Sequence, residues 1–173
     1  MMMPSTKRTM VQRRKGETCV PENGRESVEL SFRADLAWNG STGARVILGS
    51  SSSLSIDMLP EFGGKGEGFC PDELFFASIG GCLLETFLFV QKKLRLDLAG
   101  LRVVVIGEVG HPDARGYELT SIKAIIHIKT SSASVVKAEE CVRLTRDFCH
   151  LTRLIEKSTI FELTSKISTS SNE

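Results

Sequence analysis

The chain has 173 residues, a length that fits one domain or one domain with tails and that can bury a sizeable core. Apolar residues make up 41% and charged residues 25%, which excludes a chain that is disordered throughout. The net charge of +1 gives no electrostatic case for a nucleic-acid-binding or membrane-surface protein, so we expect neither nucleic acid nor membrane as a partner.

The N-terminal part of the chain predicts an arm followed by strands. Residues 1–24 are polar and charged without any period, which predicts a flexible basic arm, and no long apolar run follows that would make it a secretory signal. Alternating apolar residues over 27–38 predict a half-buried strand, and a turn cluster then leads into two further strands at 44–48 and 54–58. The glycine-rich stretch 60–68 predicts a loop.

Residues 74–90 are apolar almost all round, with Glu85 and Thr86 well inside the run. A membrane span needs about 20 apolar residues, and a buried strand would be much shorter than this run. A long central helix enclosed by protein fits best. Pro71 and the two acidic residues that follow it suit the first turn of such a helix.

The remaining pattern predicts mostly strands, with helices between the last two. In chain order we expect two long strands, a helix, a short helical piece, a last strand and a C-terminal tail, at 101–109, 117–129, 132–148, 151–157, 160–167 and 168–173. The hairpins imply antiparallel sheets with helices on one side, which is an α+β protein.

Cysteine usage points to a reducing compartment. The five cysteines stand at irregular spacing, unlike the disulfide framework of a small secreted protein. No pair has the zinc-ribbon spacing, and His111, His127 and His150 are far apart, so we expect no metal and no cofactor. Selectively reactive thiols in the cytoplasm are the favoured interpretation, with Cys141 in the core.

Two glycines precede Cys82 in the predicted central helix, and each costs roughly 1 kcal/mol relative to alanine. Either another backbone packs closely on Gly80 and Gly81, or their missing side chains open space beside the sulfur, and the two explanations are compatible. On the residues alone, an inert core thiol is the commoner outcome for a buried cysteine.

The segment from Cys70 to Cys82, CPDELFFASIGGC, resembles the hallmark helix of the OsmC/Ohr family, which opens with Pro, an acidic residue and Leu and ends at a peroxidatic cysteine. The later Cys149-His150-Leu151-Thr152 resembles the family's second hallmark, a cysteine followed closely by Ser or Thr. The resemblance implies an OsmC-like domain over residues 25–167, with antiparallel sheets around a long buried central helix in an intertwined homodimer.

The resemblance also implies a thiol-dependent peroxidase, a cysteine-based organic hydroperoxide reductase. Cys82 would become a sulfenic acid, Cys149 would resolve it as a disulfide, and a small or lipoyl-type dithiol would reduce that disulfide. An apolar pocket favours an organic hydroperoxide with a hydrocarbon tail, for which we expect contacts with Phe76, Ile79 and Glu85. Two alternatives stay open: a non-catalytic OsmC-like protein that binds a small apolar ligand, and a cysteine redox sensor.

A thiolate in an apolar site needs a nearby cation, because burial raises the pKa of a thiol. The resemblance implies an arginine held by a carboxylate; Arg45 is the first candidate and Arg33 the second. Asp72, or its neighbour Glu73, is the expected carboxylate. Ten residues of helix would separate Asp72 from Cys82 by about 15 Å, so the acid would have to come from a second copy of the chain.

Overall fold

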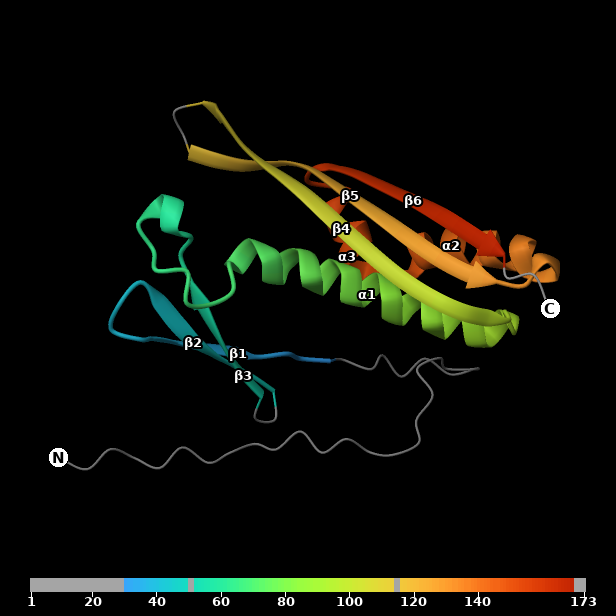
Figure 1. Cartoon of the computed structure of the whole chain (residues 1–173), viewed down its shortest axis with the longest axis horizontal. Coiled ribbons are helices and arrows are strands. Elements are labelled where there is room, and N and C mark those ends of the chain that lie inside the picture. The colour runs from blue at the N-terminus through green and yellow to red at the C-terminus, as the bar shows by residue number, and fades with distance from the viewer. Residues whose placement is uncertain (1–29, 50–51, 114–115, 170–173) are drawn as a thin grey trace. The chain divides into compact units, whose positions relative to one another are not determined.

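The computed structural model describes residues 30–49, 52–113 and 116–169, which leaves the predicted arm and the end of the C-terminal tail outside the described residues. Within the predicted domain of residues 25–167, the chain forms two compact units that divide between Cys70 and Pro71. Figure 1 shows the elements of each unit with the labels used below.

The first unit is a three-stranded antiparallel sheet in the order β1-β2-β3. Its strands are β1 (Ala34–Trp38), β2 (Gly43–Leu48) and β3 (Ser52–Asp57), which confirms the three predicted strands, although β1 begins only at Ala34. The β1–β2 turn is held by Asn39, whose Oδ1 accepts the backbone N–H groups of Ser41 and Gly43 at 2.9 and 3.3 Å.

The predicted glycine-rich loop follows β3 and contains one 3₁₀ turn, η1 (Pro60–Phe62). Asp57 holds this loop at both ends: its carboxylate accepts the backbone N–H of Met58 at 2.8 Å and that of Glu67 at 3.0 Å. The hydrogen bond from Glu67, aided by one from the Thr42 hydroxyl, lowers the pKa of Asp57 below its ordinary value. Gly68 is required here because a Cβ would stand 2.7 Å from the Ile56 carbonyl carbon.

The first unit has almost no core of its own. Among residues 30–49 and 52–70, only Val46 and Cys70 are buried apolar side chains. Phe32 is 91% exposed and Trp38 75%, and β1 is exposed along its whole length. The predicted alternation is present, but the half-buried face is corrected to an exposed one, because the described residues of this unit form a single sheet with almost no buried apolar side chain.

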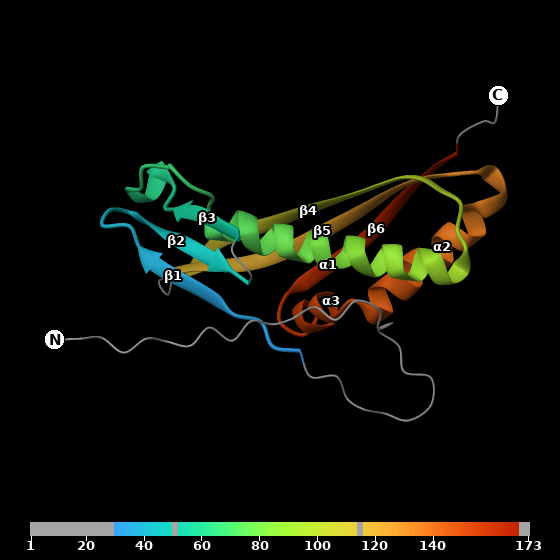
Figure 2. The same cartoon turned by 90° about the horizontal axis from the view of Figure 1, so that it is seen from below.

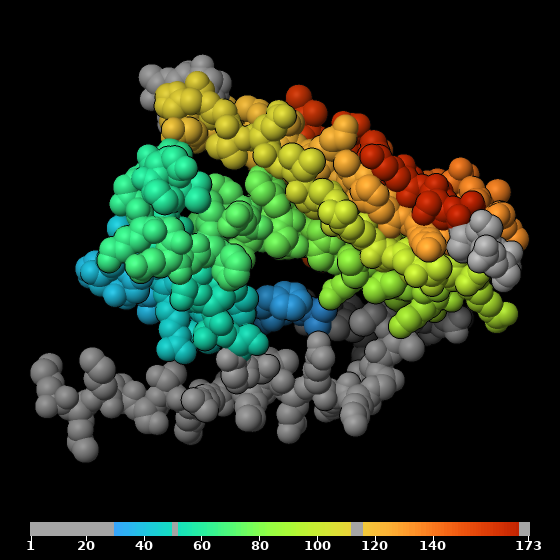
Figure 3. Space-filling view, viewed as in Figure 1, coloured from blue at the N-terminus to red at the C-terminus, as the bar shows by residue number. Residues whose placement is uncertain are grey.

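The second unit contains three helices and a three-stranded sheet in the order β4-β5-β6. The elements in chain order are α1 (Pro71–Leu94), β4 (Leu98–Asp113), β5 (Gly116–Thr130), η2 (Ser132–Ser134), α2 (Val135–Phe148), α3 (His150–Ile155) and β6 (Ile160–Thr169). Every predicted element is confirmed, with ends that shift by a few residues. Figures 1 and 2 show all three helices on one face of this sheet, and Figure 3 shows its strands as adjoining bands.

One strand direction differs from the prediction. β4 and β5 form the expected antiparallel hairpin, but β6 runs parallel to β5, so the expectation of purely antiparallel sheets is corrected to a mixed sheet. Parallel neighbours need a long crossover between them. The chain supplies it with α2 and α3, which lie between β5 and β6 in sequence and pack back on the sheet.

The core of the second unit lies between the sheet and the helices. β5 contributes every second residue, and its buried side chains are Ile122, Ala124, Ile126 and Ile128. α1 contributes residues at steps of four and three, and its buried side chains are Ile79, Leu83, Phe87 and Val90. α2 adds Ala138, Cys141 and Thr145, which confirms the core position expected for Cys141.

The core residues cover only part of the surface of α1, and positions such as Ser78, Gly81 and Glu85 are exposed. Phe75 is 42% exposed and Phe89 41%, so the predicted enclosure of the helix is met on one face only. By length and composition alone, α1 could cross a membrane, but the core helix of a soluble protein passes the same test. Among the described residues, no other helix passes it.

Candidate active site

Two cysteines that are far apart in sequence meet where α1 packs against α3. Cys82 is half-buried in the middle of α1, and Cys149 is fully buried between the end of α2 and the start of α3. Cys149 has an extended conformation that breaks the helix, while its backbone N–H still donates to the Thr145 carbonyl at 3.0 Å. This break turns its side chain into the core cluster of Ile79 and Ile122.

The two sulfurs lie 3.2 Å apart, with the Cys149 thiol donating to Cys82 Sγ. Both cysteines are free thiols in this structure. A disulfide bond is about 2.05 Å long, so the sulfurs would have to approach by a further ~1.2 Å to form one. The structure therefore brings together the two residues that the sequence selects as attacking and resolving thiols.

A third group at this position was missed by the sequence reasoning. The Nδ1 atom of His150 lies 3.6 Å from Cys82 Sγ, within hydrogen-bonding distance of a sulfur. From the sequence, His150 stands out only as a possible metal ligand, although its place directly after Cys149 in the second hallmark ties it to the resolving cysteine. Thr152 of the same segment is fully buried, and its hydroxyl has no partner among the described residues.

Burial raises the pKa of the Cys82 thiol, and the adjoining Cys149 thiol raises it further. The backbone N–H of Leu151 and the hydroxyl of Thr86 oppose this by hydrogen bonding to Cys82, but the net direction is upward. A Cys82 thiolate near neutral pH therefore needs a group that takes its proton or stabilises its charge.

The predicted activating groups lie elsewhere in the chain. Asp72 and Glu73 are exposed in the first turn of α1, and ten residues of helix place Asp72 about 15 Å from Cys82 within one chain. Arg45 is on β2 of the first unit, where its guanidinium donates to Ser53 Oγ at 3.4 Å. Arg33 pairs with Asp35 at 2.7 Å in the same unit. Their roles in activation stay predictions.

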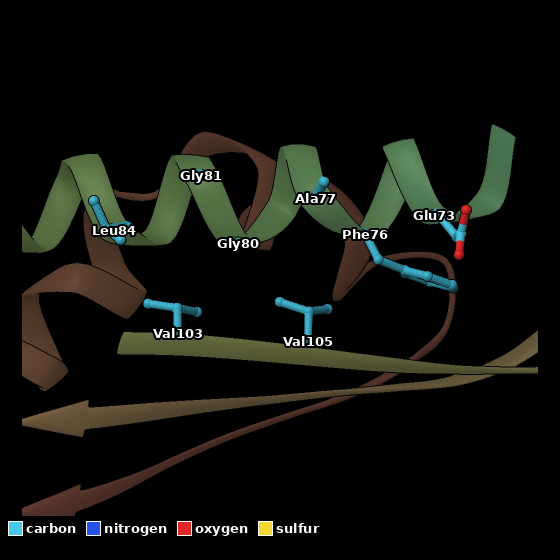
Figure 4. Close-up of a pocket in the computed structure, with 8 residues that line it drawn as sticks. All are labelled: Glu73, Phe76, Ala77, Gly80, Gly81, Leu84, Val103 and Val105. Atoms are coloured by element: carbon cyan, nitrogen blue, oxygen red, sulfur yellow. The ribbon is translucent and has the colours of Figure 1, made fainter. Parts of the chain in front are cut away.

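A groove of about 430 Å³ runs between α1 and β4 (Figure 4). Val103 and Val105 point from β4 toward the helix, and Phe76 and Glu73 lie at one end. The other lining residues are Ala77, Gly80, Gly81 and Leu84. Of the three expected substrate contacts, Phe76 lines this groove, Ile79 is fully buried in the core, and Glu85 is exposed on α1.

The two glycines of α1 differ in their surroundings. A Cβ on Gly80 would lie 3.3 Å from Val105 Cγ2, so the close neighbour is a side chain of β4 and not the backbone that the sequence offered as one explanation. A Cβ on Gly81 would meet nothing within 4 Å, which matches the open space of the other explanation. As for metals, residues 30–49, 52–113 and 116–169 bring no three potential metal-ligating side chains together.

Comparison with known proteins gives one family match and a set of similar folds. The family described as OsmC-like protein matches residues 64–164. An organic hydroperoxide resistance protein OsmC of Legionella pneumophila is 18% identical with a TM-score of 0.67, over 81% of this chain and 99% of the other. An OsmC-like protein of Mycoplasma pneumoniae is 14% identical with a TM-score of 0.70, over 83% and 100%.

A third similar structure is an organic hydroperoxide resistance protein of Elizabethkingia anophelis with thiocyanate bound, which is 14% identical with a TM-score of 0.66. It aligns over 82% of this chain and 99% of the other. No curated protein sequence matches the chain significantly. At these identities the similar structures show the fold.

Proposed function

This chain belongs to the OsmC-like protein family, and on that premise we propose that it is a thiol-dependent peroxidase that reduces organic hydroperoxides at Cys82 and Cys149. The OsmC/Ohr family includes hydroperoxide resistance proteins. The observation that carries the proposal is the 3.2 Å separation of two free thiols, one half-buried and one buried, on segments that match the family's two hallmarks.

The chemistry balances with these two thiols and one external dithiol. The Cys82 thiolate attacks the peroxide, the O–O bond breaks, and the products are a Cys82 sulfenic acid and an alcohol. The Cys149 sulfur then displaces water from the sulfenic acid and forms a disulfide. A small or lipoyl-type dithiol reduces the disulfide by two electrons and is itself oxidised to a disulfide.

The groove between α1 and β4 is an apolar surface of the second unit. Phe76, Leu84, Val103 and Val105 give it an apolar lining on which a hydrocarbon chain could be buried. We propose an organic hydroperoxide on the strength of this apolar surface, although Cys82 itself is not among the residues that line the groove.

We further propose that the protein is a cytoplasmic homodimer. OsmC-like proteins are generally soluble, which favours the interpretation of α1 as a core helix over that of a membrane span. The exposed apolar side chains of the first unit, with Phe32 and Trp38 foremost, exceed what an isolated sheet can leave in water, and a second copy would cover them. A second copy would also supply the carboxylate of Asp72 or Glu73 that one chain does not bring to Cys82.

The test is a reaction of the fully reduced protein with one equivalent of cumene hydroperoxide, followed by mapping of the thiols by mass spectrometry. We expect rapid formation of a Cys82–Cys149 disulfide, and repeated turnover once dihydrolipoamide is added. Cys82→Ser should abolish the reaction, and Cys149→Ser should stop it at a sulfenic acid that dimedone traps. Cys141→Ser, which changes a core thiol outside the pair, is the matched control.

The other outcomes separate the alternatives. Disulfide formation without turnover on any dithiol would indicate a redox sensor. An unreactive Cys82 would leave a protein that binds a small apolar ligand, and would overturn the peroxidase proposal.

A further inference from the structure

The imidazole of His150 is the titratable group, apart from Cys149, that the described residues place in contact with Cys82. Its Nδ1 lies 3.6 Å from Cys82 Sγ, while its ring is exposed to solvent. An imidazole with one nitrogen on a thiol and access to water is equipped to move a proton between them.

Two of the three arginines next to the site in sequence, Arg143 and Arg146, pair with carboxylates; the third is Arg153 on α3. On α2, Arg143 pairs with Glu140 at 2.7 Å and Asp147 at 2.9 Å. Arg146, three residues before Cys149, pairs with Glu156 at 2.9 Å. Among the described residues, the basic side chain with a hydrogen-bonding contact to Cys82 is that of His150.

We propose that His150 is a catalytic residue of this site, the base that accepts the Cys82 proton and the acid that returns it to the leaving oxygen. This role rests on the proposed peroxidase function. For Nδ1 to accept, the neutral ring carries its proton on Nε2. After the transfer, the imidazolium Nδ1–H donates to the thiolate, so one contact serves both states.

The step balances in atoms and electrons. The imidazole takes the thiol proton, and the Cys82 sulfur forms a bond to the hydroxyl oxygen of the hydroperoxide while the O–O bond breaks. The sulfur is oxidised by two electrons to the sulfenic acid and the peroxide is reduced by two. The alkoxide that leaves takes the proton from the His150 imidazolium, which gives the alcohol and restores the neutral ring.

The surroundings of Cys82 explain why such a base is needed. Burial and the adjoining Cys149 both raise the pKa of Cys82, whereas Thr86 from α1 and the Leu151 backbone of α3 only partly offset this. Glu85, three positions along α1, is exposed, and its negative charge would not favour a thiolate. A base beside Cys82 can accept the thiol proton as the sulfur attacks, so the thiol need not be ionised beforehand.

The experiment measures Cys82 reactivity in a Cys149→Ser background, in which only the first step occurs. The rates of sulfenic acid formation with cumene hydroperoxide and of alkylation by iodoacetamide are followed between pH 5 and pH 9. We expect His150→Gln to lower both rates at pH 7 by about 100-fold, the lower end of what general acid–base groups contribute. His127→Gln, on the outer side of the sheet, should leave both rates unchanged.

A second variant separates proton transfer from structure. His150→Ala should lose the same activity, and added imidazole should restore it in proportion to its concentration, which repair of a folding defect would not do. Unchanged rates in His150→Gln, or losses that imidazole does not restore while the circular dichroism matches that of the parent, would overturn the proposal. If the parent fails to react with hydroperoxide but its alkylation still depends on His150, the peroxidase proposal falls while the Cys82–His150 pair stands.

Discussion

The two three-stranded sheets of this chain solve the problem of burying their apolar faces differently. The sheet of β4–β6 is covered by its own helices, and Ile122, Ala124, Ile126 and Ile128 are at most 1% exposed. The sheet of β1–β3 leaves Leu36 57% and Trp38 75% exposed. One unit therefore carries its own core, and the other carries an apolar face without one, which a small sheet cannot sustain in water.

The largest effect that would test this contrast is a cavity in the second unit. Phe87 is fully buried among its core neighbours, so Phe87→Ala should lower the free energy of unfolding by about 3–5 kcal/mol. Phe148→Ala, at a side chain that is 64% exposed, should cost about 0.5 kcal/mol or less. Urea unfolding of the reduced protein measures both, and equal losses would remove the distinction between core and surface in this unit.

The next effect concerns the uncovered face of the first unit. If a second copy covers it, Leu36→Asp should weaken the homodimer by about 2–4 kcal/mol, as loss of an interface hot spot does, or roughly 30- to 1,000-fold in Kd. Val136→Asp, at a 76% exposed position on α2, is the control and should leave the dimer intact. Analytical ultracentrifugation reports both, and a parent chain that is monomeric at every concentration would refute the homodimer.

A smaller effect compares the two glycines of α1. Gly81→Ala should stabilise the protein by up to about 1 kcal/mol, because alanine favours a helix and the added Cβ meets nothing within 4 Å. Gly80→Ala should gain less, since its Cβ would press on Val105 Cγ2 at 3.3 Å. Thermal unfolding measures the pair. A loss of stability at Gly81 would reveal another backbone against this side of α1.

The smallest effect concerns the loop that Asp57 holds. Because its pKa is lowered in the folded chain, the stability that it contributes is present above the ordinary aspartate pKa of about 3.9 and is lost as the pH falls through the folded value. The protection of the Glu67 amide against hydrogen exchange, taken relative to the intrinsic rate at each pH, should therefore fall in acid, and Asp57→Asn should lower it already at pH 7. Glu61→Gln in the same loop should not change it.

The elements of the fold were predictable because each depends on a local pattern. The alternation in β5 and the spacing of Ile79, Leu83 and Phe87 in α1 are visible in the sequence and decide which side is buried. The direction of β6 was not predictable in this way, because its pairing with β5 depends on how α2 and α3 return the chain to the sheet.

The site was predictable where a residue sits in a recognisable segment and unpredictable where it depends on packing. Cys82 and Cys149 followed from their motifs, and the packing of α1 against α3 brought their sulfurs together. The contact of His150 with Cys82 depends on the helix break at Cys149, which no periodicity reveals. Arg45 lies in the other unit, so its role depends on placement that sequence patterns do not give.

Because Cys82 and Cys149 are so close, their oxidation to a disulfide would change the stability of the fold as well as its chemistry. The two residues are 67 positions apart, so a bond between them would close a large ring in the unfolded chain and lock the middle of α1 to the hinge of α2 and α3. Loop-closure entropy for a ring of that size corresponds to about 4 kcal/mol. Each cycle of the proposed reaction would thus form and break a cross-link within the fold. The oxidised protein should then have a higher melting temperature than the reduced protein.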